Sequence, residues 1–120
     1  MNIEVGIDLV SIERIRTFVE KFGDKGKARF LNESEISIAK SYQSIAGIWA
    51  AKEAVSKALK CGISKELTFH DIEILKSKSG APNIRLSNRV KESFKIQSTS
   101  LSITHDSGFA VAVVIILKDG

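Results

Sequence analysis

The stretch that most constrains the fold of this chain runs from Ser44 to Gly62, with the sequence SIAGIWAAKEAVSKALKCG. Its larger apolar residues recur at helical spacing, so we expect an amphipathic helix with one buried face. Ser44 is a suitable N-cap residue, and Gly62 suits the left-handed position that ends a helix. A second line, at intervals of four, three and four residues, carries two alanines and then two charges: Ala46, Ala50, Glu53 and Lys57.

The charges at Glu53 and Lys57 have two readings. Four residues apart on a helix, they have the spacing of a surface ion pair, which contributes about 0.2–0.5 kcal/mol and is usually part of a solvated face. Alternatively, the small alanines beside them allow a ligand or another chain segment to approach, and the charges then belong to a functional site. The residues elsewhere in the chain decide between these readings.

The N-terminal residues alternate between apolar and polar side chains. One face carries Ile3, Val5 and Ile7, and the other carries Glu4, Gly6 and Asp8. This period of two predicts a half-buried strand over residues 2–8 that ends at Asp8. Gly6 shares a face with Asp8, and its missing side chain would leave space for a ligand above the sheet. Taken alone, Asp8 is more typical of a turn or cap.

The rest of the chain alternates short helical and strand patterns. We expect helices over residues 11–22, 32–42 and 87–94, with a loop at 23–26 and a capping box of Asn32 and Glu35 at the start of the second helix. We expect a hairpin of strands 71–76 and 83–86, and a second pair of strands, 100–104 and 109–117, joined by a turn at 105–108. These elements predict a single α+β domain over residues 1–120, with a small antiparallel sheet and helices packed on it.

Composition narrows the class of protein. With 18 basic and 14 acidic residues the chain carries a formal charge of +4, which favours an anionic partner. The single cysteine, Cys61, excludes an intrachain disulfide and a cysteine metal cluster. No apolar run approaches the roughly 20 residues of a membrane span, and the N-terminus lacks the basic region of a signal peptide. We therefore expect a cytoplasmic protein that does not bind a membrane.

The order of three motifs resembles that of the holo-acyl-carrier-protein synthases, in the phosphopantetheinyl transferase superfamily. The motifs are GIDLV near the N-terminus, WAAKEAVSKAL in the central helix and SITHD near the C-terminus. The resemblance covers almost the whole chain, and Asp8 with Glu53-x-x-x-Lys57 is its specific part. It implies transfer of phosphopantetheine from coenzyme A to a serine of apo acyl carrier protein, which leaves adenosine 3′,5′-bisphosphate and supports fatty acid biosynthesis.

The resemblance also implies a Mg²⁺ site and catalytic residues. Asp8 and Glu53 would bind the metal, and two carboxylates leave most of its octahedral positions free for water and substrate phosphate. Glu53 and Lys57 would be catalytic, with Lys57 holding a phosphate oxygen. A metal-bound water, Glu53 or His105 could take the proton from the serine, and the sequence leaves these alternatives open.

Further residues lie near coenzyme A if the resemblance holds. They are Lys57, Lys60, Gly62, Gly80, Pro82 and His105. Two positions depart from the family pattern, because Ile48-Trp49 stands where Arg-Phe is common and Ala81 stands where Lys is common. Both changes remove a positive charge that would face the coenzyme's phosphates. Lys60, Lys76 and Lys78 are candidates to replace it.

The implied assembly is a homotrimer in which coenzyme A binds where two subunits meet. Acyl carrier proteins are acidic and this chain is basic, so we expect electrostatic steering of the carrier. The first helix directly follows Asp8 and is the expected docking surface. Its outward basic residues are Arg14, Arg16 and Lys21, and Glu13 and Glu20 dilute their charge.

The main alternative is a small basic nucleic-acid-binding module, since the chain has five arginines and thirteen lysines. These cations are scattered, and aromatic residues do not alternate with them as in a stacking platform. A metal-dependent phosphohydrolase would share Asp8, Glu53 and Lys57 but would need a positioned attacking water. We therefore expect the transferase and no nucleic-acid partner.

Overall fold

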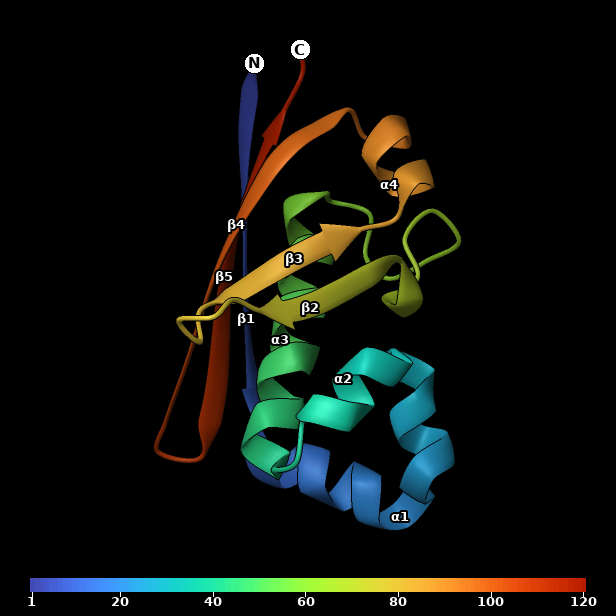
Figure 1. Ribbon diagram of the computed structural model, residues 1–120, viewed down its shortest axis with the longest axis vertical. Coiled ribbons are helices and arrows are strands. Elements are labelled where there is room, and N and C mark those ends of the chain that lie inside the picture. Colours follow the sequence, from blue (N-terminus) through green and yellow to red (C-terminus); the bar gives the residue numbers. More distant parts are fainter.

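The structure is a computed structural model that describes residues 1–120, and it has the expected α+β architecture (Figure 1). Its strands are β1 (Asn2–Ser11), β2 (Ile72–Lys76), β3 (Pro82–Leu86), β4 (Ile96–Asp106) and β5 (Phe109–Lys118). Its helices are α1 (Ile12–Phe30), α2 (Glu33–Ile38), α3 (Tyr42–Ala58), the short 3-10 helix η1 (Phe69–Asp71) and α4 (Asn88–Ser93). The strands form two antiparallel sheets, one of three strands in the order β1-β5-β4 and one of the two strands β2 and β3.

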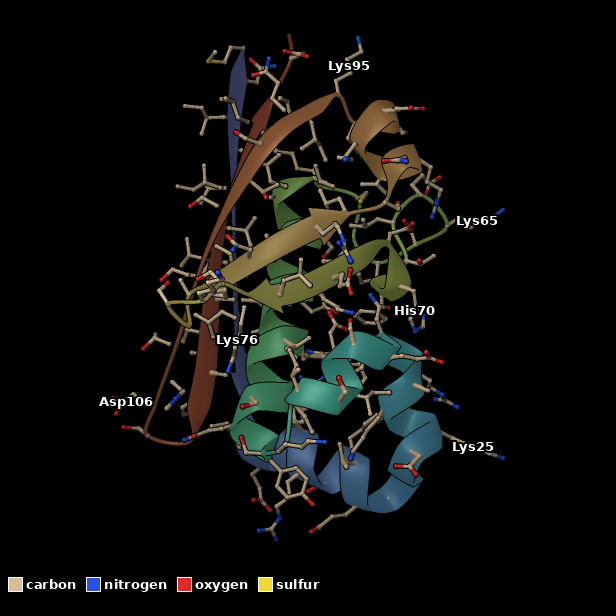
Figure 2. The ribbon with its side chains drawn as sticks, viewed as in Figure 1. Lys25, Lys65, His70, Lys76, Lys95 and Asp106 are labelled. Atoms are coloured by element: carbon tan, nitrogen blue, oxygen red, sulfur yellow. The ribbon has the colours of Figure 1, made fainter.

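The three-stranded sheet is pinned by a tight hairpin between β4 and β5. Only Ser107 and Gly108 lie outside the strands, and both have positive φ, at 53° and 84°. Two-residue loops with left-handed residues match the twist of the flanking strands. The expected four-residue turn at 105–108 is therefore wrong, because β4 continues through His105 to Asp106, which Figure 2 shows at the tip of the hairpin. His105 is held on a strand, opposite Ala110 of β5.

The central helix α3 packs on this sheet at very short distance, and Gly6 is the reason. A Cβ at Gly6 would lie 1.9 Å from the carbonyl oxygen of Ala54 and 2.7 Å from the backbone nitrogen of Ala58. Ala54 and Ala58 are themselves buried. The expected space above Gly6 is thus filled by the α3 backbone rather than by a ligand.

The burial of α3 is broader than its apolar stripe predicts. Ile45, Ile48, Val55 and Leu59 are buried as expected, but 11 of the 17 residues of α3 are buried in all. Ala46 and Ala50 belong to the core and do not line an approach to the charges. A helix buried around most of its circumference lies between other elements of a protein. In Figure 1 the three-stranded sheet runs along one side of α3, the β2–β3 hairpin crosses in front of α3 in this view, and α2 lies on the side away from the sheet.

The ends of α3 differ from the expected ones by about three residues. Ser41 is the N-cap, and its hydroxyl accepts a hydrogen bond of 3.0 Å from the backbone N–H of Ser44. At the other end Lys60 takes the left-handed conformation, with φ of 61°, before Gly62 does the same at 66°. Helix ends are often uncertain by one or two residues.

Two other helices also differ in length from their predictions. The helix α1 leaves helical geometry only at Gly23, with φ of 59°, and then resumes as far as Phe30. The expected loop at 23–26 is therefore a kink. The helix α2 ends at Ile38, short of the expected 42, although its capping carboxylate is as predicted: the backbone N–H of Asn32 donates to Glu35 Oε1 over 2.7 Å.

A buried ion pair joins α2 to α3. Lys52 and Glu35 are both 0% exposed, and Lys52 Nζ lies 2.7 Å from Glu35 Oε1. Lys52 also donates to the carbonyl oxygens of Phe30 and Phe69, and Glu35 Oε2 accepts the backbone N–H of Ile74. Each charge is thus hydrogen-bonded on several sides, as buried charges need to be. Through these hydrogen bonds the pair connects α1, α2, η1 and β2 to Lys52 of α3, the residue before Glu53.

The outer face of the three-stranded sheet is apolar and uncovered. All the helices lie on its other face (Figure 1). The side chains of β1 that point away from α3 are Ile3, Val5, Ile7 and Leu9, which are 69%, 65%, 57% and 58% exposed. The alternation in β1 is as predicted, but its apolar side faces outward. No helix of the chain is long and apolar enough to cross a membrane.

Candidate functional site

Strand β1 and helix α3 bring the predicted metal and catalytic residues together. Asp8 is largely buried on the α3-facing side of β1, and Lys57 Nζ donates to its Oδ1 over 2.9 Å. Glu53 lies one helical turn before Lys57. Lys57 therefore forms its ion pair with a residue 49 positions away, and none of the seven ion pairs is the Glu53–Lys57 pair expected from spacing alone.

The pKa of Glu53 reflects its burial and the nearby carboxylate of Asp8. Its pKa is raised, first because burial disfavours the charged form and second because Asp8 lies nearby. The positive charges of Lys57 and Arg14 act in the opposite direction. A carboxyl group whose pKa is raised by burial and by a nearby carboxylate is a common feature of functional sites.

The donor set of this cluster fits a hard divalent cation. Asp8 and Glu53 supply carboxylate oxygens, which Mg²⁺ prefers, and a cation between them would relieve their mutual repulsion. No group of three His, Cys, Asp or Glu side chains suited to a metal occurs in the structure. A metal at this place would have two protein ligands and would complete its coordination with water or phosphate oxygens.

Two further predicted residues lie at the end of α3. Lys60 Nζ is 3.4 Å from a carboxylate oxygen of Glu4, which precedes Asp8 on the same face of β1. Gly62 follows with no neighbouring atom within 4 Å of the position a Cβ would take. Lys57 and Lys60 therefore lie along the β1 edge of the sheet, and Gly62 follows them in the chain.

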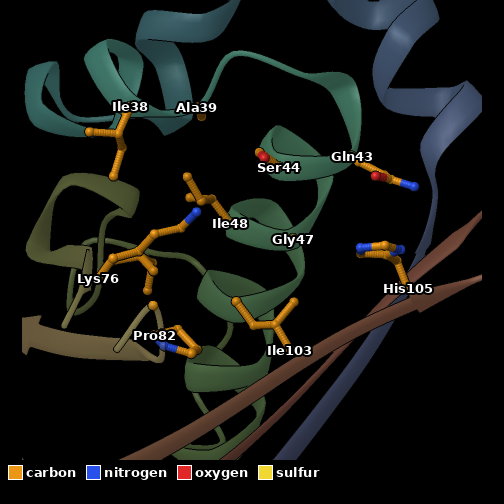
Figure 3. A pocket seen from close by; sticks show the side chains of 12 residues that line it. Ile38, Ala39, Gln43, Ser44, Gly47, Ile48, Lys76, Pro82, Ile103 and His105 are labelled. Carbon is orange, nitrogen blue, oxygen red and sulfur yellow. The ribbon is translucent and has the colours of Figure 1, made fainter. Parts of the chain in front are cut away.

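The other predicted coenzyme residues line a separate pocket of about 300 Å³ (Figure 3). Gly80 and Pro82 come from the β2–β3 turn and β3, and His105 comes from β4. Ile48 of α3 and Lys76 of β2 also line it. The family resemblance places Gly80, Pro82 and His105 near coenzyme A, and the structure gathers them around one cavity. The sequence offers Lys76 only as a candidate to replace a missing positive charge. Its place in this pocket depends on how the β2–β3 hairpin packs against α3, which the sequence does not show.

Helix α3 separates the pocket from the carboxylate cluster. Asp8 is on β1 and His105 is on β4, and these are the two opposite edges of the β1-β5-β4 sheet. Gly47 of α3 faces Ile103 of β4, with a Cβ position 3.2 Å from its side chain. The two groups of predicted residues thus lie on opposite flanks of α3 within one chain.

The basic residues of α1 have different surroundings. Arg14 is exposed and acts on the pKa of Glu53, so it lies near the carboxylate cluster. Arg16 lies 3.6 Å from Glu13 and 3.7 Å from Glu20, which offset its charge. Lys21 Nζ lies 5.3 Å from the centre of the Phe22 ring. Of the three, Arg14 has the most direct access to the cluster.

Comparison with known proteins gives a consistent result. A sequence model of the 4′-phosphopantetheinyl transferase superfamily matches residues 4–114. A holo-[acyl-carrier-protein] synthase from Nitratiruptor is 56% identical over 114 residues, covering 95% of this chain and 98% of its own, and one from Wolinella succinogenes is 57% identical with 95% and 97% covered.

Comparison with solved structures identifies the same family. The holo-[acyl-carrier-protein] synthase of Helicobacter pylori, crystallised in complex with coenzyme A, superimposes with a TM-score of 0.92 at 53% identity, covering 94% of this chain and 99% of that one. The synthase of Neisseria meningitidis gives a TM-score of 0.88 at 30% identity, with 96% and 98% covered. On this evidence, the chain belongs to the 4′-phosphopantetheinyl transferase superfamily and, within it, to the holo-[acyl-carrier-protein] synthase family.

Proposed function

We propose that the chain transfers the phosphopantetheine group of coenzyme A to a serine of apo acyl carrier protein, a step in fatty acid biosynthesis. The serine oxygen forms a bond to the phosphorus that carries pantetheine, and the bond from that phosphorus to the bridging oxygen of the diphosphate breaks. The serine gives up its proton to water, Glu53 or His105, and adenosine 3′,5′-bisphosphate leaves. The observation that carries the proposal is the cluster of Asp8, Glu53 and Lys57 in a chain whose relatives are synthases of this kind.

Within this proposal each residue of the cluster has a role. Asp8 and Glu53 hold Mg²⁺, which supplies Lewis-acid stabilisation to the diphosphate when bound. Lys57 is half exposed, so its ammonium can exchange the contact with Asp8 for one with a phosphate oxygen. Lys60 lies on the same edge. Lys60 and Gly62, which follows it closely in the chain, border the coenzyme in this proposal. These groups stabilise the negative charge that grows on the leaving phosphate.

The carrier protein docks on α1 in this proposal. The acidic surface of the carrier would meet Arg14 first, because Arg14 lies beside the carboxylate cluster. Lys21, farther along α1, extends the basic surface, and Arg16 adds less because two glutamates already offset it. Charges on an exposed helix steer association more than they add affinity.

We further propose that the active form is a homotrimer with one site at each subunit contact. Two observations support assembly. The outer face of the sheet is apolar and uncovered, which is typical of surfaces that bind another protein. The pocket with Gly80, Pro82 and His105 lies across α3 from the cluster, so a second copy is needed to bring such a pocket next to Asp8.

The direct test is the intact mass of an apo acyl carrier protein after incubation with the chain, coenzyme A and Mg²⁺. We expect a gain of one phosphopantetheine group per carrier. Asp8→Asn and Glu53→Gln should lower the rate by roughly a thousandfold or more, because the metal loses a charged ligand. Glu92→Gln, on exposed α4, removes the same charge elsewhere and should leave the rate unchanged.

Removal of Mg²⁺ with a chelator should stop the reaction, and its return should restore it. An unmodified carrier under all these conditions would contradict the proposed activity. Full activity of Asp8→Asn or Glu53→Gln would contradict the metal assignment but not the proposed transfer reaction.

A further inference from the structure

Lys52 and Glu35 form a buried pair of charges that the proposed reaction does not use. Both side chains are 0% exposed, whereas each of the other ion pairs has at least one partner that reaches solvent. A buried ion pair is weak evidence for stability, because desolvation of the two charges cancels much of their attraction and apolar residues of similar volume often serve as well. Stability alone therefore does not account for two charges at this place.

The ammonium group of Lys52 is held from three directions. It donates to the carbonyl oxygen of Phe30 over 2.7 Å, to Glu35 Oε1 over 2.7 Å and to the carbonyl oxygen of Phe69 over 3.2 Å. These acceptors belong to α1, α2 and η1, and they use all three donors of the ammonium group. Hydrogen bonds are directional, whereas apolar contacts are not. Lys52 therefore fixes the position of its turn of α3 relative to three other elements.

The residue two positions later is fixed from the opposite side. Successive residues of an α-helix differ in direction by about 100°, so Lys52 and Ala54 point to roughly opposite sides of α3. Ala54 is buried against β1, and a Cβ at Gly6 would lie 1.9 Å from its carbonyl oxygen. Glu53 lies between these two fixed residues, and its carboxylate is near enough to Asp8 for the two charges to interact. The direction of the Glu53 side chain thus depends on Lys52 on one side of α3 and on Gly6 on the other.

We propose that Lys52 is a positioning residue, which fixes the rotation of α3 about its axis and thereby holds Glu53 in place to bind the metal with Asp8. The inference rests on the proposed function, in which these two carboxylates bind Mg²⁺. Metal ligands have to be held to within about 0.5 Å of their productive geometry by the groups around them. A rotation of α3 would swing the Glu53 carboxylate away from Asp8, and the three hydrogen bonds of Lys52 oppose that rotation.

The test compares two variants that differ only at position 52. Glu35→Gln keeps an amide oxygen that can accept from Lys52, and the double variant, Lys52→Met with Glu35→Gln, removes the ammonium group without leaving a buried charge unpaired. Electron paramagnetic resonance of the free ion measures the dissociation constant of each protein for Mn²⁺, a probe of carboxylate sites. We expect Glu35→Gln to stay within about twofold of the wild type. The double variant should bind about tenfold or more weakly, the usual cost of removing a group that orients a metal ligand.

Val90→Ala is the control for a loss of stability alone. Val90 is buried on α4, which packs on β4, and it makes none of the hydrogen bonds that hold Lys52. This variant should lower the melting temperature through the cavity it leaves, with the Mn²⁺ constant unchanged within about twofold. In transfer assays the Mn²⁺ concentration that gives half the maximal rate should rise about tenfold in the double variant and stay the same in Val90→Ala.

Equal Mn²⁺ constants for Glu35→Gln and the double variant, or the same loss in Val90→Ala, would overturn the positioning role. Failure of the double variant to fold, followed by circular dichroism, would assign the pair to stability and overturn the role as well. A wild type that binds no Mn²⁺ and transfers no phosphopantetheine would instead contradict the proposed function, and the inference would fall with it.

Discussion

At the scale of single residues, Gly6 sets the distance between the sheet and α3. Its missing side chain lets the helix backbone approach until a Cβ would lie 1.9 Å from the oxygen of Ala54. This contact also brings Glu53 and Lys57 of the same helix to Asp8, two residues after Gly6. One glycine therefore couples the packing of the core to the geometry of the carboxylate cluster.

We expect Gly6→Ala to destabilise the protein by about 1–3 kcal/mol or more, because backbone atoms of α3 must move to admit the methyl group. Urea unfolding followed by circular dichroism measures the change. Gly47→Ala is the matched control, since its Cβ would meet only side-chain atoms, those of Ile103 at 3.2 Å, and no backbone. Equal midpoints for the two variants would show that the close approach at Gly6 does not limit stability.

The residue scale also shows where sequence reasoning worked and where it could not. Asp8, Glu53 and Lys57 could be grouped in advance through the resemblance, and the structure gathers them, although Lys57 pairs with Asp8. Glu35 was recognised as a capping residue, but its partner Lys52 was not. That pair depends on a contact across 17 positions between separate helices, which no local pattern reveals.

At the scale of elements, the basic residues of α1 differ in whether acidic side chains lie beside them. Arg14 stands free near the cluster, whereas Arg16 has Glu13 and Glu20 within 3.7 Å. We expect Arg14→Gln to raise the Michaelis constant for the carrier protein severalfold, because a charge that steers an acidic partner is lost. The constant for coenzyme A should stay nearly the same.

Arg16→Gln is the control on the same helix and should have a smaller effect, because its charge is already offset. Added salt should weaken carrier binding more in the wild type than in Arg14→Gln, since exposed charges are screened over about 10 Å at 0.1 M. Equal sensitivity to salt in the two proteins, with an unchanged constant for the carrier, would place the docking surface elsewhere.

The elements themselves were largely predictable, and their ends were not. The β2–β3 hairpin, the capping carboxylate of α2 and the strand β5 follow local patterns of turn residues and alternation. The sequence predicts a loop where the structure has a kink at Gly23, because a glycine can either interrupt a helix or end it and packing decides between the two. The sequence predicts that His105 belongs to the turn. In the structure Ser107 and Gly108 alone reverse the chain, so His105 stays on β4.

At the scale of the whole molecule, the uncovered apolar sheet face was the hardest feature to predict. Alternation in β1 shows two faces but not which of them is inside, and apolar residues normally face the core. Here the polar side, with Gly6 and Asp8, faces α3, and the apolar side faces outward. The arrangement is consistent with the proposed assembly, in which each active site combines the cluster of one copy with the pocket of another.

Complementation between two defective variants tests this account most directly. Glu53→Gln disables the cluster, and Lys76→Gln with His105→Ala disables the pocket, so neither variant should transfer phosphopantetheine well when coenzyme A is limiting. Co-expression in equal amounts, with one variant tagged, yields mixed assemblies that can be purified and sized. Some subunit contacts in them unite an intact cluster with an intact pocket.

If the site is shared between copies, each mixed closed trimer has one contact that unites an intact cluster with an intact pocket, so we expect roughly 30% of the wild-type rate from the purified mixed assemblies. If the site lies within one chain, every copy carries a defect and the mixture stays as inactive as its parts. A mixed assembly with no gain over the separate variants, or an active monomer in sedimentation, would contradict the account.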